Sequence, residues 1–266
     1  MHDHGSVTPH PPVYLSTVAL ERNRWTTARI PTILAGEWAE RAMADGFDGI
    51  ELWENHFFHA SQNERARLRE ISASSPRRWI FNTYRGFDSP PGEPGEVDPA
   101  GIADAIRALN AHAVKFNVGA SESRRSHYLR NVRDWLGTLP DGCLPLCECH
   151  PGTILENPRE AQEFFAELEP FDVGVIVHPC SVAADTLRRW LDTGRVRHVH
   201  VQSRSGALAA GSEACRKIEM VAISAPDASY AIEFTHVTAQ PDETAESAYQ
   251  AALHDARVVR GIVNPA

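Results

Sequence analysis

The sequence predicts a single (β/α)8 barrel of the α/β class, and three observations lead to this fold. Apolar segments of strand length alternate with segments of helical periodicity along the whole chain. These segments make eight strand–helix pairs with nothing left over, and 266 residues suit a barrel of about 250 residues. Four of the strand-like segments also carry a polar residue near their C-terminal end. A doubly wound open sheet is the alternative, but no G-x-G-x-x-G motif opens the first expected helix.

The elements follow one another in strict alternation. The expected strands are short apolar runs at residues 13–19, 49–53, 79–84, 113–118, 144–149, 173–178, 196–201 and 230–234. The expected helices have apolar residues at helical spacing or a charged face, at residues 32–45, 63–73, 100–110, 125–136, 159–168, 183–191, 213–222 and 242–259. Such an order implies parallel strand pairing through right-handed crossovers. We expect residues 1–12 to be a flexible N-terminal tail and residues 13–266 to form the barrel domain.

Charge, cysteine spacing and apolar runs limit which partners the protein can bind and in which cellular compartment we expect it. The formal net charge of -9 argues against a protein that binds duplex nucleic acid, because phosphate backbones attract positive surface. The five cysteines form no CxxC pair, the N-terminus lacks the pattern of a signal peptide, and no apolar run approaches the ~20 residues of a membrane helix. We therefore expect a cytoplasmic protein that does not bind membranes, and the sequence is compatible with a homo-oligomer.

Two long connections follow strands and are therefore expected on the face of the barrel where the strands end. Residues 86–98 follow the third strand, and residues 203–212 follow the seventh. Long loops at this face often serve as lids, although a tolerated surface insertion is the alternative.

Four polar residues lie at equivalent places in the last four strand–helix pairs. They are Glu148, His178, His200 and Glu233. The C-terminal ends of barrel strands converge on one face, and strand alternation turns all four side chains toward the barrel interior. Two carboxylates and two imidazoles meeting there predict a site for one divalent metal ion. Because imidazole is a softer ligand than oxygen, this set favours Zn, Mn, Co or Fe over Mg.

Each of these residues also has a structural interpretation. Either glutamate could instead form a buried ion pair with a basic residue, and His178 could be a hydrogen-bonded core histidine. His198 lies one step deeper in the seventh strand, so we expect it to be a core residue that supports a ligand. In the eighth strand, alternation predicts that Phe234 faces the helices.

Several of these segments resemble one known superfamily. The segments Gly-Phe-Asp-Gly-Ile-Glu-Leu at residues 46–52, Glu-Cys-His-Pro-Gly-Thr at residues 148–153, His-Val-His at residues 198–200 and the late Glu233 are similar to those of the xylose-isomerase-like sugar phosphate isomerases and epimerases. That superfamily consists of TIM barrels, and it includes ketose epimerases, hydroxypyruvate isomerase, inosose dehydratase and endonuclease-IV-type enzymes. The similarity covers nearly the whole chain, and it specifies the fold and the site more than the substrate.

The resemblance implies roles for most of the expected site. In that superfamily a Glu, an Asp, a His and a Glu from the last four strands commonly hold one divalent metal, and the two glutamates often act as acid and base. Glu148, His200 and Glu233 match these positions, whereas His178 stands where the family usually has Asp. The change favours metals that bind imidazole, or else it indicates a site that is repurposed or has lost its metal.

The expected chemistry is proton transfer next to a carbonyl group. A metal that chelates a carbonyl and the neighbouring hydroxyl acidifies the C–H bond between them, and Glu148 and Glu233 form the catalytic acid/base pair. An enediolate formed in this way predicts a sugar isomerase or epimerase acting on a sugar, keto-sugar or related polyol. The same intermediate would allow a lyase or dehydratase on the same substrate class. A catalytically silent barrel that acts as a binding or partner subunit is the alternative from another class.

Further polar residues near the strand ends are candidates for binding the small carbohydrate-like substrate. They are Glu51, Trp53, His56, Lys115, Asn117, His150 and Arg204. Lys115 could instead form an internal ion pair with Glu51 or Glu148. Arg204 follows the seventh strand and could bind an anionic group through two parallel hydrogen bonds, or it could be an ordinary solvated arginine.

Overall fold

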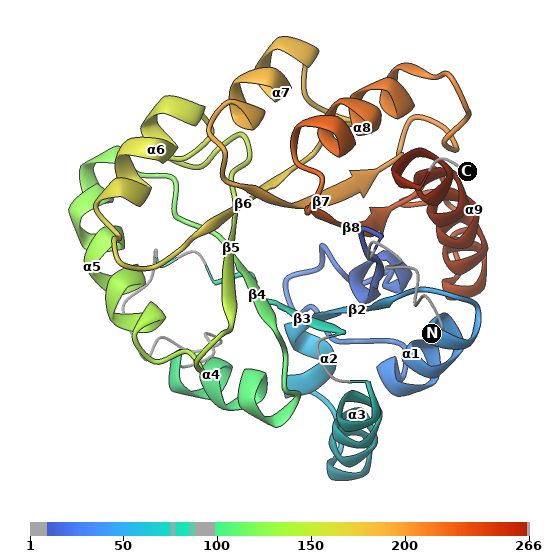
Figure 1. Cartoon of the computed structure of the whole chain (residues 1–266). Coiled ribbons are helices and arrows are strands. Elements are labelled where there is room, and N and C mark those ends of the chain that lie inside the picture. The colour runs from blue at the N-terminus through green and yellow to red at the C-terminus, as the bar shows by residue number, and fades with distance from the viewer. Residues whose placement is uncertain (1–9, 76–77, 86, 88–98, 265–266) are drawn as a thin grey trace, which may run out of the picture.

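The chain folds into a closed barrel of eight parallel strands in the order β1 to β8, which confirms the predicted fold (Figure 1). The computed structural model describes residues 10–75, 78–85, 87 and 99–264. The strands are β1 (Val13–Ser16), β2 (Gly49–Trp53), β3 (Trp79–Asn82), β4 (Ala113–Phe116), β5 (Leu144–Glu148), β6 (Gly174–Val177), β7 (Val196–Gln202) and β8 (Ser229–Phe234). Each strand pairs in parallel with the next, and β1 pairs with β8 to close the barrel.

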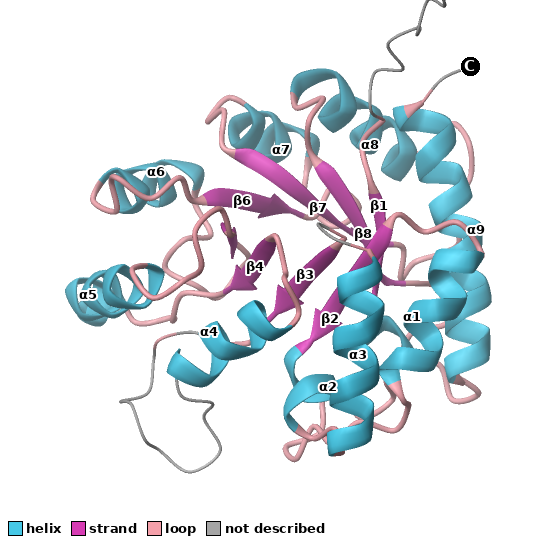
Figure 2. Cartoon of the chain, turned by 60° about the horizontal axis from the view of Figure 1, so that its bottom comes forward, coloured by secondary structure: helices cyan, strands magenta, loops and turns pink. Residues whose placement is uncertain are grey.

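Helices surround the strands on the outside, as both views show (Figures 1 and 2). They are α1 (Ala35–Ala44), α2 (Glu54–Phe58), α3 (Gln62–Ser74), α4 (Pro99–Ala108), α5 (Arg125–Leu136), α6 (Pro158–Ala166), α7 (Ala184–Leu191), α8 (Glu213–Ser224) and α9 (Ala245–Val263). A short 3-10 helix, η1 (Thr17–Leu20), follows β1, and another, η2 (Glu122–Arg124), directly precedes α5. In the described part of the chain, no helix is long and apolar enough to cross a membrane.

The barrel interior is divided into an apolar half and a polar half. One cluster of buried side chains fills the half near the strand N-termini, and it consists of Tyr14, Ile80, Ala113, Leu146, Ile176 and Ala231. The residues that alternate with these along the strands pack outward against the helices and form the main core. Because the apolar cluster closes one end of the barrel, the inward polar residues near the strand C-termini lie above a solid floor.

The first two strand–helix units differ from the sequence prediction. The first strand ends at Ser16 rather than at residue 19, and η1 begins at Thr17. The Thr17 hydroxyl accepts a hydrogen bond from the Trp53 backbone N–H and lies 2.9 Å from His56 Nδ1, so it joins the ends of β1 and β2. The short helix α2, which begins directly after Trp53, was not expected.

Phe234 does not face the helices, and that prediction was wrong. It belongs instead to a small buried cluster with Val18 and Trp53 above the barrel floor. The register of β7 and β8 shifts after Val201, so that Phe234 pairs with the inward-facing Gln202. The irregularity breaks the simple alternation on which the prediction depended.

The loop after β7 is anchored to α9. The Ser203 hydroxyl and the Leu208 backbone N–H both donate hydrogen bonds to the Asp255 carboxylate. Leu208 is buried, so this loop is held down by its own contacts, and the structure does not favour the expected lid. The other expected lid, residues 86–98, lies outside the described residues except for Phe87.

The expected N-terminal tail is described only from residue 10 onward. The Pro12 carbonyl accepts a hydrogen bond from the Tyr230 backbone N–H, so the chain already contacts β8 just before β1 begins.

Candidate metal centre

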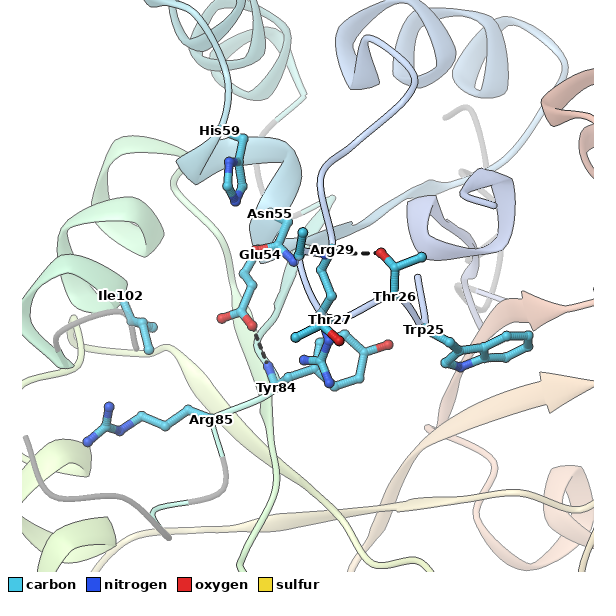
Figure 3. A pocket seen from close by; sticks show the side chains of 11 residues that line it. Trp25, Thr26, Thr27, Arg29, Glu54, Asn55, His59, Tyr84, Arg85 and Ile102 are labelled. Carbon is cyan, nitrogen blue, oxygen red and sulfur yellow. Dashed lines mark hydrogen bonds between the residues drawn. The ribbon is translucent and has the colours of Figure 1, made fainter. Parts of the chain in front are cut away.

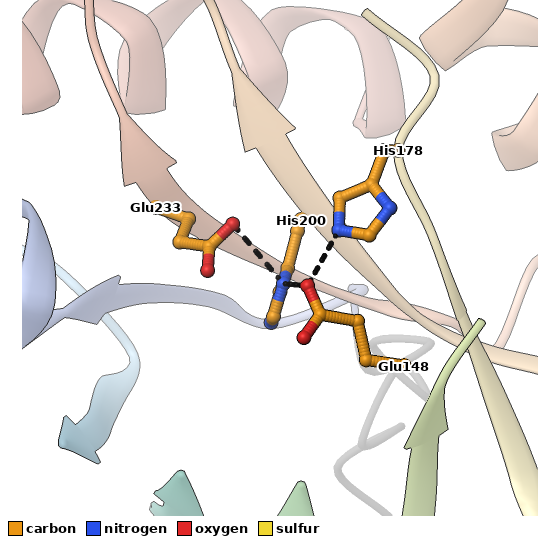
Figure 4. A group of neighbouring side chains, drawn as sticks. All are labelled: Glu148, His178, His200 and Glu233. Atoms are coloured by element: carbon orange, nitrogen blue, oxygen red, sulfur yellow. Dashed lines mark hydrogen bonds and ion pairs between the residues drawn. The ribbon is translucent and has the colours of Figure 1, made fainter. Parts of the chain in front are cut away.

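The four predicted residues at the ends of β5 to β8 come together above the barrel floor (Figure 4). Glu148, His178, His200 and Glu233 each offer one ligand atom, and these atoms lie within 4.8 Å of one another. All four side chains are buried. Figure 4 shows Glu148 and Glu233 on opposite sides of His200, with His178 above Glu148.

His200 is the centre of this group. Its Nδ1 lies 3.2 Å from Glu233 Oε2 and 3.5 Å from Glu148 Oε1, whereas its Nε2 lies 3.0 Å from Glu51 Oε2. Burial opposes the charged form of this ring, but the carboxylates of Glu233, Glu51 and Glu148 outweigh it and raise the His200 pKa well above its usual value. The three surrounding carboxylates therefore favour positive charge at this point.

Glu51 supports His200 from below. Its Oε2 also lies 3.0 Å from Nε2 of His198, while its Oε1 accepts hydrogen bonds from the Ser16 hydroxyl at 2.8 Å and the Asn82 amide at 2.6 Å. Burial alone would raise the Glu51 pKa, but the two histidines hold it well below its usual value. This carboxylate is thus ionised and fully engaged, and it orients the imidazole of His200.

His198 lies deeper, as expected, and is completely buried. Its Nδ1 is 2.6 Å from the Ser229 hydroxyl, and burial lowers its pKa. Ligand atoms of Glu51, His198 and His200 also lie within 4.8 Å of one another. Because both oxygens of Glu51 already have partners, we assign this lower group to supporting the centre.

The two oxygens of Glu148 have different surroundings. Oε2 is 2.7 Å from Lys115 Nζ and accepts a hydrogen bond of 2.9 Å from the Asn117 amide. Oε1 faces the two histidines, with His178 Nε2 at 2.9 Å. Burial opposes ionisation, but Lys115 and the histidines hold the Glu148 pKa well below its usual value. Glu148 is therefore an anion with one oxygen held by Lys115 and Asn117 and the other directed into the cluster.

Glu233 completes the cluster from β8. Its Oε2 accepts a 2.6 Å hydrogen bond from the Gln202 amide. This amide comes from the neighbouring strand β7 and holds the carboxylate beside His200 Nδ1, as Lys115 and Asn117 hold the carboxylate of Glu148.

The residues fit a divalent metal ion. No described residue forms a hydrogen bond of normal geometry with the buried Nδ1 of His200, although two carboxylates lie close to it. An imidazole that donates from one nitrogen to a carboxylate presents the lone pair of the other nitrogen to a metal. Two glutamate oxygens and the His178 nitrogen would complete a mixed N/O ligand set of the kind that first-row transition metals accept.

Two aromatic residues that the sequence reading missed form the wall of the cavity above the cluster. This cavity of about 330 Å³ is lined by Trp25 and Tyr84 in addition to Glu148, His178 and Glu233. Trp25 lies in the loop between η1 and α1, and Tyr84 follows β3. Both positions come after strand ends, which is the signal that could have identified them. Tyr84 is partly buried; desolvation, and after it the carboxylates of Glu233 and Glu148, raise its pKa well above the usual value, so its hydroxyl stays protonated.

A second cavity of about 690 Å³ adjoins the first, and Trp25 and Tyr84 line both (Figure 3). Polar side chains line it, including Thr27 from the loop before α1, Asn55 from α2 and His59 just after α2. Burial raises the pKa of the Glu54 carboxyl in this cavity, even though the Thr83 hydroxyl and the Tyr84 backbone N–H both donate to it.

Three of the residues expected to bind substrate lie beneath the cavities instead. Glu51 and Trp53 have no exposed surface, and both are covered by the residues above them. His56 is buried, with its Nε2 2.8 Å from Glu21 Oε1 and its Nδ1 next to Thr17. The polar groups of Glu51 and His56 bond within the barrel, and the Trp53 ring is fully buried, so the structure does not place these three side chains where we expected substrate contact.

The other four expected residues lie at or near the cluster. Lys115 is buried and paired with Glu148, which is one of the alternatives foreseen for it, and Asn117 bonds both. His150 and Arg204 line the cavity above the cluster. The Arg204 guanidinium lies over the rings of Phe234 and Trp25, at 4.3 and 4.9 Å from their centroids.

The fold is shared with known structures. Solved structures that match nearly the whole chain are xylose isomerase-like TIM barrels, and this chain has their fold. One is D-psicose 3-epimerase from Clostridium cellulolyticum H10 with D-tagatose, which is 13% identical, has a TM-score of 0.66 and covers 93% of this chain and 99% of its own. Another is a xylose isomerase-like TIM barrel protein from Mycobacterium smegmatis in complex with magnesium, at 13% identity, a TM-score of 0.64 and coverage of 95% and 98%.

The same fold carries other reactions. Endonuclease IV from Thermus thermophilus is 16% identical, with a TM-score of 0.63 and coverage of 96% of this chain and 100% of its own. No protein-family model matches the chain. The stress response protein ish1 of Schizosaccharomyces pombe is 26% identical over 108 residues, which are 41% of this chain and 16% of that protein. At these identities the likeness to the solved structures defines the fold alone, and the reaction has to be argued from the site.

Proposed function

We propose that the protein is a metal-dependent isomerase or epimerase that acts on a sugar, keto-sugar or related polyol. The observation that carries this proposal is the pair of carboxylates, Glu148 and Glu233, on opposite sides of His200 in one buried cluster. They come from β5 and β8, so they reach a bound substrate from two directions. The fold shared with an epimerase supports the same conclusion.

Glu148, His178, His200 and Glu233 would hold one divalent ion. When bound there, such an ion polarises a carbonyl oxygen and lowers the pKa of the neighbouring C–H bond. The imidazole ligands favour Zn, Mn, Co or Fe over Mg. His178 lies 2.9 Å from Glu148, so the histidine that replaces the usual aspartate does not leave a gap in the cluster. This placement favours an active centre over a silent barrel.

Glu148 and Glu233 carry out the proton transfer. One carboxylate removes the proton from the carbon next to the carbonyl group. A proton returned to this carbon from the opposite face by the other carboxylate inverts the centre, whereas a proton given to the former carbonyl carbon, with the hydroxyl proton passing to the other oxygen, moves the carbonyl group. Lys115 and Asn117 fix the Glu148 carboxylate, and Gln202 fixes that of Glu233. Trp25 and Phe234 add aromatic surface to the wall of this space.

The test combines elemental analysis with hydrogen exchange in deuterated water. Purified protein should contain about one divalent ion per chain. Ketoses, inososes and keto-glycosides are then incubated with the loaded protein, and solvent deuterium at the carbon next to the carbonyl group is measured by mass spectrometry. An epimer or isomer as product supports the proposal, whereas loss of water would identify the dehydratase alternative.

Two glutamine variants test the acid/base pair. Glu148→Gln and Glu233→Gln should each reduce exchange by a factor of about 100 or more, because each removes a proton-transfer group. Metal content is measured on each variant, since both residues are also ligands. Glu70→Gln on the exposed face of α3 removes a carboxylate far from the site and should change nothing. Full activity in both site variants, or no bound metal after reconstitution, would overturn the proposal.

A further inference from the structure

Two arginines at the cavities present positive charge that no described residue pairs with. The Arg29 guanidinium lies 4.8 Å from the centroid of the Tyr84 ring, and that of Arg204 lies over Phe234 and Trp25. Both side chains are exposed, and neither forms an ion pair or a side-chain hydrogen bond with any residue that the structure describes. Stacking on an aromatic ring orients a guanidinium group and leaves its N–H donors free.

These two arginines differ from Arg24, which lies next to Trp25 in the chain. Arg24 is buried, and its guanidinium is taken up by the Glu243 carboxylate and two backbone carbonyl groups. Arg24 therefore holds the loop that carries Trp25. The guanidinium N–H groups of Arg29 and Arg204, in contrast, donate to no described residue.

The carboxylates nearby do not neutralise these arginines. Glu148 and Glu233 are bound by Lys115 and Gln202. The Glu54 carboxyl shares the larger cavity with Arg29, and the charge of Arg29 acts to lower its pKa, although the larger effect of burial raises it. Glu54 accepts hydrogen bonds from Thr83 and from the Tyr84 backbone, and no ion pair joins it to Arg29. The entrance to a strongly acidic cluster thus carries positive charge without a partner among the described residues.

Trp25 and Tyr84 connect the two cavities, and each of the two arginines stacks on one of these rings. A substrate with its reacting carbon over the cluster would fill the smaller cavity of about 330 Å³ and extend past these rings into the larger one. Arg204 lines the first cavity, and Arg29 lines the second (Figure 3).

We propose that Arg29 and Arg204 bind an oxyanion, a carboxylate or a phosphate monoester, at the end of the substrate that does not react. The inference rests on the proposed function, because it places the reacting end over Glu148 and Glu233. The substrate is then an anionic sugar derivative. Guanidinium groups recognise both oxyanions through paired hydrogen bonds. Thr27 and Asn55 line the larger cavity and offer further polar contacts.

The experiment measures binding to the metal-loaded full-length protein by isothermal titration calorimetry. Two matched pairs serve as probes, D-fructose 6-phosphate with D-fructose and D-glucuronate with D-glucose. At least one anion should bind about tenfold or more tightly than its neutral partner, because hydrogen bonds to charged groups are among the strong ones. The pair that shows this preference identifies the oxyanion as phosphate or carboxylate.

Arginine variants locate the preference. Arg29→Met and Arg204→Met keep an apolar side chain on the aromatic rings and remove the charge, so each should reduce the preference several-fold. Arg69→Met, at an exposed position on α3, removes the same charge far from the cavities and should retain the preference. Thermal unfolding of each variant confirms that it is folded.

The outcomes separate this inference from the proposed function. The inference is overturned if neither anion binds better than its neutral partner. It is also overturned if the preference persists in both arginine variants, because the anion would then bind the metal directly. Metal content is measured on the same samples. Protein that holds metal and exchanges protons but has no anion preference contradicts this inference alone.

Discussion

Glu51 should control the metal affinity of a site that it does not touch. Its Oε2 is 3.0 Å from His200 Nε2, so a proton on this nitrogen leaves the lone pair of Nδ1 for the metal. In Glu51→Gln, the carbonyl oxygen would still accept from Ser16 and Asn82, and the amide group would face the histidines as a donor. His200 would then move its proton to Nδ1, which cannot bind a metal while protonated. We expect metal affinity to fall about 10- to 100-fold.

The assay is a competition titration of the metal against a chelator of known affinity. Nitrogen NMR shifts of His200, measured in the same variant, report which ring nitrogen carries the proton. Ser16→Ala is the matched control, because it removes the 2.8 Å hydrogen bond to the other oxygen of Glu51. It should reduce stability by about 1 kcal/mol and leave metal affinity nearly unchanged. Folded Glu51→Gln protein that binds metal with wild-type affinity would refute the orienting role.

The remaining predictions concern His178 and Asp255. His178→Asp places a carboxylate next to Glu148 and should shift metal preference toward Mn or Mg, measured as the ratio of affinities for Zn and Mn. An unchanged ratio would mean that His178 is not a ligand. Burial raises the Asp255 pKa, so its contribution to stability is complete below the pKa of the unfolded chain and declines as pH rises through the higher folded value. Urea unfolding of Asp255→Asn from pH 4 to pH 7 should therefore show the variant gaining stability relative to the wild type, and a constant difference would contradict this.

The barrel could be predicted from the sequence because its signals are local and repeated. Each strand–helix pair has its own periodicity, and the recurrence of a polar residue at four strand ends indicates from the sequence where the side chains converge. The four side chains do meet, within 4.8 Å. Strand parity was sufficient for Glu148, His178 and His200, even though the pairing of β6 with β7 shifts register between Val175 and Ile176.

Features that depend on irregular backbone could not be predicted in this way. The register shift after Val201 turned Phe234 into the cavity wall, and no residue pattern marks such a shift. By strand alternation, the Glu51 side chain points into the barrel, as the side chain of a substrate-binding residue would. Only its position one layer deeper, with partners from β1, β3 and β7, shows that it orients His200. Trp25 reaches the site from a loop whose path depends on the buried pair of Arg24 and Glu243, which are 219 residues apart.

The distribution of charge explains why the centre suits a divalent cation and its entrance suits an anion. Glu51, Glu148 and Glu233 bring three carboxylates into a space where Lys115 is the buried lysine, so with neutral histidines the described cluster keeps two excess negative charges. Isolated buried charges cost several kcal/mol each, and a divalent ion would offset this excess. With the centre neutralised in this way, Arg29 and Arg204 still have no ion-pair partner among the described residues. Their positive charge then acts on whatever enters the cavity, which favours a substrate that brings its own negative charge.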